Sequence, residues 1–341
     1  MQYSLNQYTL IPKSVSDITS RKSLNVFDHE GKMPVFVAPM TCILSKENFE
    51  KFNSSPFIPI YPVRYQENLQ FRLNFAKEHS NCWIAVTLRE FKDRFCSVEK
   101  GKDSYRILID CADGHLKELY KNVKKAKRNY PNLEVMIGNI ANPKAFLECC
   151  RAGVDYVRVG IGGGNGCTTS VLTGFHASLP WLLIEISKLK KKIKRRNKFL
   201  KIFTKQGEEF CTKVVADGGI DTTAKALKCL ALGADYVMMG KMFARCSESC
   251  GAGSDGTVEY YGQASTKGQL DRFGEVRSVP EGVVRTFSLK YSLDSLGNFL
   301  EGVFQSALSY GGAKNFEEFI GNVEYDIMSN SEFNMFNKDT E

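Results

Sequence analysis

The sequence predicts a single (β/α)₈ barrel, and three observations lead to this fold class. Eight short apolar or β-branched runs recur along the 341 residues, and longer stretches, several of helical character, separate them. Runs that are apolar throughout are typical of parallel strands buried on both faces. Glycines and polar side chains follow most of the runs, as at the catalytic face of a barrel. A doubly wound sheet is the alternative, but eight strand–helix repeats favour closure.

The eight runs predict the strands in chain order. They cover residues 35–40, 57–63, 82–87, 106–110, 134–138, 156–160, 213–216 and 236–239. Two of the helices between them have clear ends in the sequence. One opens at Asn142-Pro143 and stops at Gly153, and another opens at Asp221-Thr222 and stops at Gly233. Both pair a capping residue at the start with a glycine at the end.

The segment after the eighth run completes the predicted domain. Residues 246–280 are glycine-rich and polar, and they are too long for a simple connection, which predicts an active-site loop. Residues 292–310 predict the closing helix. Patterning is weak beyond residue 322, so we expect a mobile tail over 322–341. The strand–helix unit is the one internal repeat we find, and we expect residues 1–341 to form one barrel domain.

Composition is typical of a soluble globular protein, with 43% hydrophobic and 25% charged residues. The first residues show no signal-peptide run, and no stretch approaches the ~20 apolar residues of a membrane span. We therefore expect a soluble cytoplasmic protein without a membrane partner. Eleven cysteines in such a chain predict buried apolar residues rather than disulfides. The four scattered histidines argue against a zinc site.

The net charge of +8 comes from one segment. Residues 187–206 hold ten Lys/Arg and no Asp/Glu, which leaves 36 basic and 38 acidic residues, a net −2, in the rest of the chain. A basic run can bind nucleic acid. We favour a solvated helix face or a mobile insertion instead. The segment has two aromatic residues, Phe199 and Phe203, which is a poor platform for stacking single-stranded bases.

The loop after the sixth strand is the sharpest chemical signal. It has five glycines between Gly160 and Cys167, and Thr168 and Thr169 follow. Glycines let the backbone approach a ligand closely, and backbone N–H groups at such a loop can activate a thiolate. A flexible turn before a buried cysteine is the alternative. The spacing therefore makes Cys167 a candidate nucleophile.

Two further glycine turns follow the seventh and eighth strands. They are Asp217-Gly218-Gly219 and Gly240-Lys241. Barrel enzymes commonly bind phosphate at the loops after these two strands, and exposed N–H groups suit an anion. Asp217 can accept hydrogen bonds from ribose hydroxyls. Two ordinary turns are the alternative, but their coincidence with the phosphate position favours binding.

These motifs together resemble the IMP dehydrogenase/GMP reductase family. The resemblance rests on Gly160-Ile-Gly-Gly-Gly-Asn-Gly-Cys167-Thr-Thr, Ala216-Asp-Gly-Gly-Ile220 and Gly233-Ala-Asp-Tyr-Val-Met-Met-Gly240, in family order. Four further segments resemble the short bacterial-type GMP reductases: Ala38-Pro-Met-Thr, Pro62-Val-Arg64-Tyr, Asp110-Cys-Ala-Asp-Gly-His115 and Tyr260-Tyr-Gly-Gln-Ala-Ser265. The sequence between Glu67 and Asp110 leaves no room for the regulatory module that many IMP dehydrogenases carry.

The resemblance implies a fold, a reaction and an assembly. It implies a (β/α)₈ barrel, usually in a homotetramer, acting on a purine nucleoside monophosphate. It implies that Cys167 attacks C2 of the purine and that NADPH, or NAD in a dehydrogenase, takes part in hydride transfer. Our leading expectation is GMP reductase, which turns GMP into IMP and ammonia. An IMP dehydrogenase without its regulatory module, forming XMP, is the first alternative.

The resemblance also assigns roles to single residues. Thr169 and Glu281 would manage protons beside Cys167, and Asp110 would face the reacting groups. The substrate would contact Asn165, Asp217, Gly218, Gly219, Gly240, Lys241, Tyr261 and Arg64. The cofactor would contact Asp110, Asn139, Gly160, Ala264 and Ser265. Backbone carbonyls of Gly162, Gly164 and Cys167 would be able to hold a monovalent cation such as K⁺.

Departures from the family pattern leave a second alternative open. Gly163 replaces a usual proline, Asn165 a usual serine or lysine, and Lys241 a usual small residue, while residues 187–206 look like an insertion. Asp271-Arg272-Phe273 is similar to the Arg-Tyr flap of dehydrogenases but lacks the tyrosine hydroxyl. The alternative is a catalytically weak member that binds nucleotides, or RNA through the basic insertion.

Overall fold

Eight parallel strands close into a barrel, which confirms the fold class predicted from the apolar runs. The computed structural model describes residues 3–79, 82–97, 101–111, 113–164, 167–203, 212–329 and 331–333, with the backbone alone for 196–203. The barrel strands are β2 (Val35–Val37), β3 (Ile58–Tyr61), β4 (Trp83–Val86), β5 (Arg106–Ile109), β6 (Glu134–Ile140), β7 (Tyr156–Val159), β8 (Lys213–Asp217) and β9 (Tyr236–Met239). Each strand pairs with the next along the chain, and β9 returns to β2, where Met238 lies opposite Phe36.

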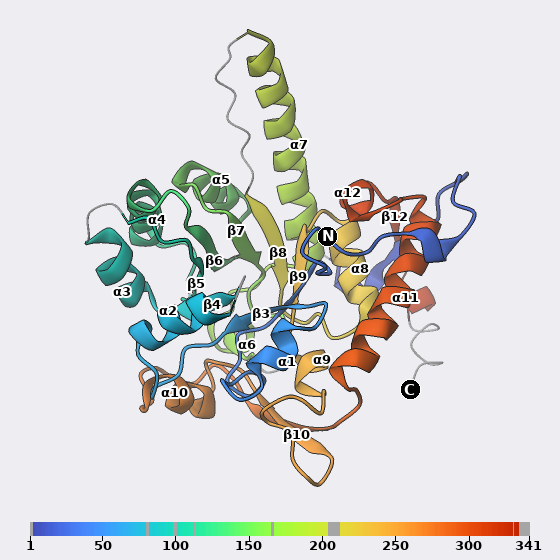
Figure 1. Cartoon of the computed structure of the whole chain (residues 1–341). Coiled ribbons are helices and arrows are strands. Elements are labelled where there is room, and N and C mark those ends of the chain that lie inside the picture. Colours follow the sequence, from blue (N-terminus) through green and yellow to red (C-terminus); the bar gives the residue numbers. More distant parts are fainter. Residues whose placement is uncertain are drawn as a thin grey trace.

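Helices surround the barrel and follow the strands in turn (Figure 1). They are α1 (Phe49–Asn53), α2 (Leu69–Glu78), α3 (Leu88–Phe91), α4 (Lys117–Asn129), α5 (Pro143–Ala152), α6 (Thr169–Thr173), α7 (Leu179–Phe203), α8 (Thr223–Ala231), α9 (Lys241–Ala244), α10 (Thr266–Phe273), α11 (Leu293–Gly311) and α12 (Phe316–Phe319). Short 3₁₀ turns cover Leu5–Gln7 and Arg21–Ser23, and a π-helical turn covers Lys92–Cys96. None of these helices combines the length and apolar character that a bilayer crossing requires within the described ranges.

The predicted helix ends are formed by side-chain caps. The Asn142 side chain accepts a hydrogen bond from the Lys144 N–H at the start of α5, and Gly153 ends that helix in the left-handed region with φ 77°. Thr222 caps α8 and Ser292 caps α11 in the same way. These caps satisfy N–H groups that the first helical turn leaves without partners.

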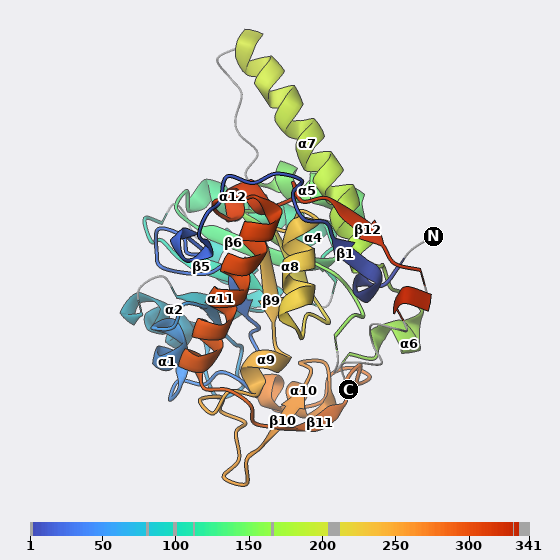
Figure 2. The same cartoon turned by 90° about the vertical axis from the view of Figure 1, so that its right-hand side faces the viewer.

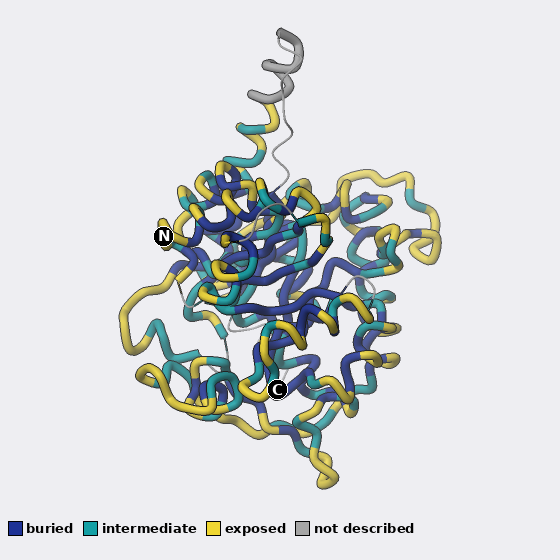
Figure 3. Tube along the Cα trace, turned by 60° about the vertical axis from the view of Figure 1, so that its left-hand side comes forward, coloured by how far each residue is buried: buried dark blue, intermediate teal, exposed yellow. Residues whose placement is uncertain are grey.

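The interior of the barrel differs between its two ends. Phe36, Trp83, Tyr156 and Tyr236 fill the end where the strands begin, with ring centroids 5.0–6.0 Å apart in edge or tilted contacts. The strands are buried along most of their length, as the dark core of Figure 3 shows. Charged side chains occupy the end where the strands finish. The four aromatic side chains therefore stabilise one end of the barrel interior, and the polar end is where an active site is expected.

Two small antiparallel sheets lie outside the barrel. β10 (Thr257–Tyr261) pairs with β11 (Val284–Ser288), and together with α10 they cover the carboxyl ends of the strands (Figure 1). The expected active-site loop of residues 246–280 thus contains β10 and α10. β12 (Tyr325–Ile327) pairs with β1 (Tyr8–Leu10), which holds the first part of the predicted mobile tail; residues 334–341 lie outside the described part.

The basic segment predicted as an insertion continues helix α7. Leu182, Leu183 and Ile186 in the first half of α7 are buried against the barrel. The second half stands out from the end where the strands begin, away from α10 and β10 (Figures 1 and 2). Residues 204–206 of the segment lie outside the described residues.

Candidate active site

The loops after β7 and β8 approach each other so closely that two positions require glycine. Gly160 has φ 127°, and a Cβ there would lie 2.2 Å from the carbonyl oxygen of Asp217. Gly219 has φ 73°, and its Cβ would lie 2.3 Å from the carbonyl oxygen of Gly163. Any other residue would push the loops apart, since such contacts are far below van der Waals separation. The glycines therefore set the spacing between the cysteine loop and the predicted phosphate loop.

A small cleft of about 80 Å³, partly open to solvent, lies beside these loops. Its walls are Ala38, Met40, Gly164, Asp217, Gly218, Gly219, Ile220, Asp221, Met238, Gly240, Lys241 and Tyr260. Five of the predicted substrate residues, Asp217, Gly218, Gly219, Gly240 and Lys241, are therefore brought together.

Lys241 supplies a positive charge to this cleft. Its Nζ lies 3.6 Å from Asp221 Oδ2 and 4.6 Å from the centre of the Phe287 ring. The salt bridge is longer than a hydrogen bond, so the ammonium keeps donor capacity for a further anion. Lys241 is the first residue of α9, where the backbone N–H groups also favour negative charge.

Cys167 lies at one end of a chain of three side chains. Its Sγ donates a hydrogen bond to Thr169 Oγ1 over 3.2 Å, and Thr169 Oγ1 donates to Glu281 Oε2 over 2.5 Å. Thiol, hydroxyl and carboxylate are thus connected in a line. Such a chain can carry a proton between a sulfur nucleophile and a carboxylate. Gly164 links Cys167 to the cleft, because a Cβ at Gly164 would lie 3.5 Å from the Cβ of Cys167.

Backbone contacts hold Glu281 against the cysteine loop although 112 positions separate it from Thr169. The Thr168 N–H donates to the Glu281 carbonyl over 3.0 Å, and the Glu281 N–H donates to the Ala264 carbonyl over 3.0 Å. Cys167 and Gly282 form an isolated antiparallel bridge. The segment that covers the strand ends therefore delivers the carboxylate to the thiol.

The other cysteines are poorly suited to act as nucleophiles. Burial raises the pKa of nine of them in the described part of the chain: Cys42, Cys82, Cys96, Cys111, Cys149, Cys150, Cys229, Cys246 and Cys250. Cys111 is the nearest rival at a strand end. Burial and then the Asp110 charge raise its pKa to about 11.

A buried charge network joins the ends of β5, β6, β7 and β8. Arg158 donates to Asp110 Oδ1 over 3.0 Å and to Asp217 Oδ2 through Nε and Nη2, over 3.1 and 3.0 Å. Asn139 Nδ2 donates to Asp217 Oδ2 over 2.9 Å and to the Gly160 carbonyl over 2.7 Å. Arg158 therefore orients the predicted residues Asp110 and Asp217, and Asn139 joins the network through Asp217. Charge-assisted hydrogen bonds of this kind fix geometry.

Arg158 is the residue that our reading of the sequence missed. It is the third residue of β7, between the buried Val157 and Val159. A charged residue at an inward position of a barrel strand is the signal that points to it, since strand side chains alternate between the interior and the helices.

Arg272 of helix α10 adds a second cation to this charge network. Its Nη2 lies 2.8 Å from Asp110 Oδ2, and both side chains are almost buried, at 12% and 13% exposure. Burial opposes ionisation of Asp110, but Arg272 and Arg158 outweigh it and hold the pKa of the carboxyl below its ordinary value. Asp110 is therefore an anion held by two cations, one from the barrel and one from α10.

Four predicted binding residues lie in the segments that shape the entrance. Arg64 Nη2 donates to the carbonyls of Thr41 and Leu44, over 2.7 and 2.5 Å. The Tyr261 hydroxyl donates to Asp271 Oδ2 over 2.6 Å. Ser265 caps α10 through the Gly268 N–H, and the preceding Ala264 holds Glu281. Their side chains are not among the walls of the cleft described above.

The predicted cation loop is folded around its own backbone groups. The Gly162 carbonyl accepts from the Ser170 hydroxyl over 3.4 Å, and the Gly164 carbonyl accepts from the Cys167 N–H over 3.0 Å. Asn165, predicted to contact phosphate, lies outside the described residues. No cluster of three or more His, Cys, Asp or Glu side chains is placed to hold a metal ion in the described ranges.

Comparison with known proteins decides the family. The family model named IMP dehydrogenase / GMP reductase domain matches residues 76–335. The chain belongs to the IMP dehydrogenase/GMP reductase family. The predicted resemblance is therefore confirmed, and both activities in the family name are oxidoreductase activities. The cysteine loop, Glu281 and most walls of the cleft lie within the matched residues, whereas the cleft residues Ala38 and Met40 precede them.

Relatives carry both names of the family. An inosine-5'-monophosphate dehydrogenase of Chlorobaculum parvum is 34% identical over 248 residues, 67% of this chain and 46% of that protein. A GMP reductase of Staphylococcus epidermidis is 29% identical over 313 residues, 89% of this chain and 88% of that protein. A GMP reductase of Streptococcus pneumoniae is 29% identical over 320 residues. The chain thus spans less than half of this dehydrogenase but most of the Staphylococcus reductase.

Proposed function

We propose that this chain is a GMP reductase that converts GMP, NADPH and a proton into IMP, ammonia and NADP⁺. The observation that carries the proposal is the hydrogen-bonded series of Cys167, Thr169 and Glu281 beside a cleft with phosphate-binding features. The match along nearly the whole length of the Staphylococcus reductase supports it.

In the first step the amino group of GMP is replaced by sulfur. Cys167 attacks C2 of the purine, so the C2–S bond forms and the bond from C2 to the amino nitrogen breaks. The thiol proton passes through the Thr169 hydroxyl to Glu281 and then to the departing nitrogen, which leaves as ammonia. Relay through a hydroxyl and a carboxylate needs the short contacts observed between these groups.

In the second step C2 gains hydrogen. The nicotinamide dinucleotide, when bound, supplies a hydride to C2, and the C2–S bond breaks to release IMP. Cys167 leaves as a thiolate and takes up one proton. Glu281 takes up this proton from solvent and passes it to the thiolate through Thr169, so the same relay serves both steps.

The cleft provides contacts for the phosphate and ribose. Gly218, Gly219 and Gly240 offer backbone N–H groups, and Lys241 offers charge. All three hydrogen bonds that Asp217 receives from Asn139 and Arg158 reach its Oδ2. We propose that Oδ1 of Asp217 accepts from the ribose hydroxyls.

Gln263 provides a polar group for the base. Its Nε2 donates to the Pro39 carbonyl over 2.7 Å, and this acceptor fixes the orientation of the amide. Its Oε1 is buried without a partner among the described residues. The neighbours of Pro39, Ala38 and Met40, are walls of the cleft. A buried acceptor without a partner costs about 1–3 kcal/mol, and we propose that an N–H of guanine satisfies it.

The residues assigned to the dinucleotide fit its chemistry. Asp110 is an ionised carboxylate and Asn139 is an amide, and both lie at the strand ends beside Gly160, where a side chain has no room. Carboxylate and amide groups suit the carboxamide and hydroxyls of a nicotinamide nucleotide. We propose that Asp110, Asn139, Gly160, Ala264 and Ser265 hold it.

Two further features implied by the family are part of the proposal. Each carbonyl oxygen has two lone pairs, so the carbonyls of Gly162 and Gly164 keep capacity for K⁺ beside the bonds they accept. A homotetramer is the expected assembly. Val171, Leu172 and Phe175, beside the cysteine loop, are more than half exposed, which is consistent with a subunit contact.

An IMP dehydrogenase without its regulatory module is the second candidate. The identity of 34% to the Chlorobaculum dehydrogenase favours it. A dehydrogenase must activate water to release XMP, however, and Phe273 has no hydroxyl for that purpose. Arg272, the neighbouring cation, is bound to Asp110. The relay to Glu281 instead serves the release of ammonia.

One assay separates the two candidates. The purified protein is mixed with GMP and NADPH, and in parallel with IMP and NAD, while nicotinamide absorbance and ammonia are followed. The proposal predicts GMP-dependent loss of NADPH with one ammonia released per NADPH oxidised. IMP-dependent formation of NADH would support the dehydrogenase instead. A folded protein that does neither would contradict both candidates.

A further inference from the structure

The outer faces of helices α4 and α7 are basic over most of their described length, although α4 exposes one acidic residue, Glu118, in its first turn. From Lys121 to the end of α4, every exposed residue is Lys or Arg: Lys121, Lys124, Lys125 and Arg128. From Lys188 to Arg195 on α7, the exposed residues are Lys188, Lys191, Lys192, Lys194 and Arg195. We call these nine residues the basic face. Residues 196–205 add four more Lys/Arg in the sequence.

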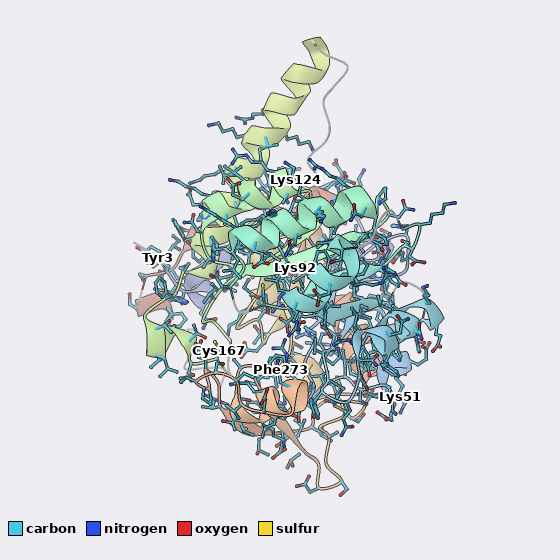
Figure 4. All side chains as sticks on the ribbon, turned by 90° about the vertical axis from the view of Figure 1, so that its left-hand side faces the viewer. Tyr3, Lys51, Lys92, Lys124, Cys167 and Phe273 are labelled. Atoms are coloured by element: carbon cyan, nitrogen blue, oxygen red, sulfur yellow. The ribbon has the colours of Figure 1, made fainter. Side chains whose placement is uncertain are left out.

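The two helices belong to one side of the molecule. Helix α5 packs against both α4 and α7, so it lies between them. Figure 4 shows Lys124 in the half of the molecule from which α7 protrudes, whereas Cys167 and Phe273 lie in the opposite half. The basic face therefore lies away from the proposed active site, and a large ligand bound there leaves the entrance open.

Acidic side chains neutralise little of the basic face. Lys188 pairs with Glu185, and on α5 Glu148 pairs with Arg151. Lys191 donates to the Gly321 carbonyl. The four exposed cations of α4 and Lys192, Lys194 and Arg195 of α7 form no ion pair within the described ranges. Like charges within each of the two groups repel one another, and a polyanion relieves that repulsion.

We propose that the basic face binds the phosphate backbone of a nucleic-acid duplex without reading its base sequence. The second half of α7 stands free of the barrel, and a free helix about 10–12 Å across fits a major groove about 12 Å wide. The cations of α4 would contact the adjacent backbone. The activity proposed for Cys167 plays no part in this inference.

The exposed chemistry disfavours an acidic membrane as the partner. Helices that lie on membranes bury an apolar face in the lipid and present cations beside it. The basic face has no exposed apolar residue, because Leu189 and Ile193 of α7 pack partly against the core. Its attraction is therefore electrostatic, which suits phosphates in solution.

The test measures binding of the full-length protein to a short fluorescent DNA duplex by anisotropy at several salt concentrations. If the basic face contacts phosphates, binding should depend steeply on salt. Each phosphate contact should add about −0.9 to the slope of log K, the association constant, against log [salt]. Two triple variants remove three charges each. They are Lys121→Gln/Lys124→Gln/Lys125→Gln and Lys192→Gln/Lys194→Gln/Arg195→Gln. A matched control, Lys46→Gln/Lys51→Gln/Lys290→Gln, removes three exposed lysines elsewhere.

Each basic-face variant is expected to weaken binding at least tenfold and to reduce the salt slope by about 2–3, while the control changes neither. Circular dichroism spectra and urea-unfolding midpoints should be unchanged in all three variants, which shows that they fold. Absent duplex binding, or equal loss in the control, would overturn the proposal. So would tighter, salt-resistant binding to phosphatidylserine vesicles than to the duplex.

Discussion

The thiol of Cys167 lies 3.2 Å from the hydroxyl of Thr169, to which it donates a hydrogen bond. The two residues are only two positions apart in the sequence. The contact gains functional meaning because the same Thr169 hydroxyl donates to Glu281, which belongs to a segment distant in the sequence. The thiol is thereby connected to a carboxylate without touching it.

Replacing Glu281 by glutamine should slow turnover about 10²–10⁴-fold, because an amide cannot take up and return the proton. The Kd for GMP should stay within a factor of two or three, since the phosphate and ribose contacts come from other loops. Stopped-flow oxidation of NADPH and calorimetric titration of GMP measure the two quantities. Glu275→Gln, on the same covering segment but paired with Arg277 at the surface, is the control. Unimpaired turnover in Glu281→Gln would remove the relay.

Replacing Lys241 by methionine should weaken binding of GMP about tenfold, because a charge-assisted hydrogen bond contributes about 1.5–3 kcal/mol. Guanosine, which lacks the phosphate, should bind both proteins equally. Lys290→Met is the matched control, since Lys290 also lies over an aromatic ring, that of Tyr291, but outside the cleft. A parallel loss for guanosine would show that Lys241 does not act on phosphate.

Replacing Gly160 by alanine should destabilise the protein by clearly more than the about 1–2 kcal/mol that a left-handed alanine costs. The added Cβ would lie 2.2 Å from the Asp217 carbonyl, so β8 and its loop must shift. Gly256→Ala is the control, because Gly256 has φ 77° but no atom within 4 Å of the added Cβ. Urea unfolding compares the two. Equal losses of stability in the two variants would mean that the close approach of the two loops at Gly160 does not restrict this position.

Replacing Arg272 by glutamine should lower stability in a pH-dependent way. The pKa of Asp110 lies below its ordinary value, so its ionisation stabilises the fold above the unfolded-state pKa of about 3.9. That contribution disappears as the pH falls through the lower folded-state pKa. Loss of Arg272 raises the pKa of Asp110. The variant should therefore lose about 2 kcal/mol at neutral pH and less near pH 4.

Urea unfolding at the two pH values tests this sign. Arg277→Gln is the comparison, because the side chains of Arg277 and Glu275 are 55% and 66% exposed, and such pairs contribute about 0–1 kcal/mol. A loss in Arg272→Gln that grows on acidification would contradict the assigned charge state of Asp110.

The barrel could be predicted from the sequence because its strands are locally distinctive. All eight apolar runs became strands, and β9 matches residues 236–239 without adjustment. Asn142, Thr222 and Ser292 marked helix starts because capping depends on residues three or fewer positions away. Cys167 and the glycine turns could be predicted for the same reason, because their signals lie within a few neighbouring residues.

Long-range relationships were the part that the sequence did not reveal. In the sequence, Arg158 is a single charged residue within a predicted strand. Its hydrogen bonds to Asp110 and Asp217 form only because the barrel brings the ends of β5, β7 and β8 together. The pairing of β1 with β12 joins the two ends of the described chain through short segments that are hardly apolar. The sequence also did not single out the basic residues of α4, because only the fold brings α4 and α7 to the same side of the molecule, on either side of α5.

The most direct test of the account is turnover of Cys167→Ser measured together with its binding of GMP. We predict that GMP-dependent oxidation of NADPH falls at least 10³-fold, because a serine hydroxyl is far less ionised than a thiol at neutral pH. The Kd for GMP should remain within about threefold of the unmodified protein, and Cys111→Ser should keep most of the activity. GMP should also protect Cys167 from alkylation. Near-normal turnover in folded Cys167→Ser would contradict the covalent mechanism.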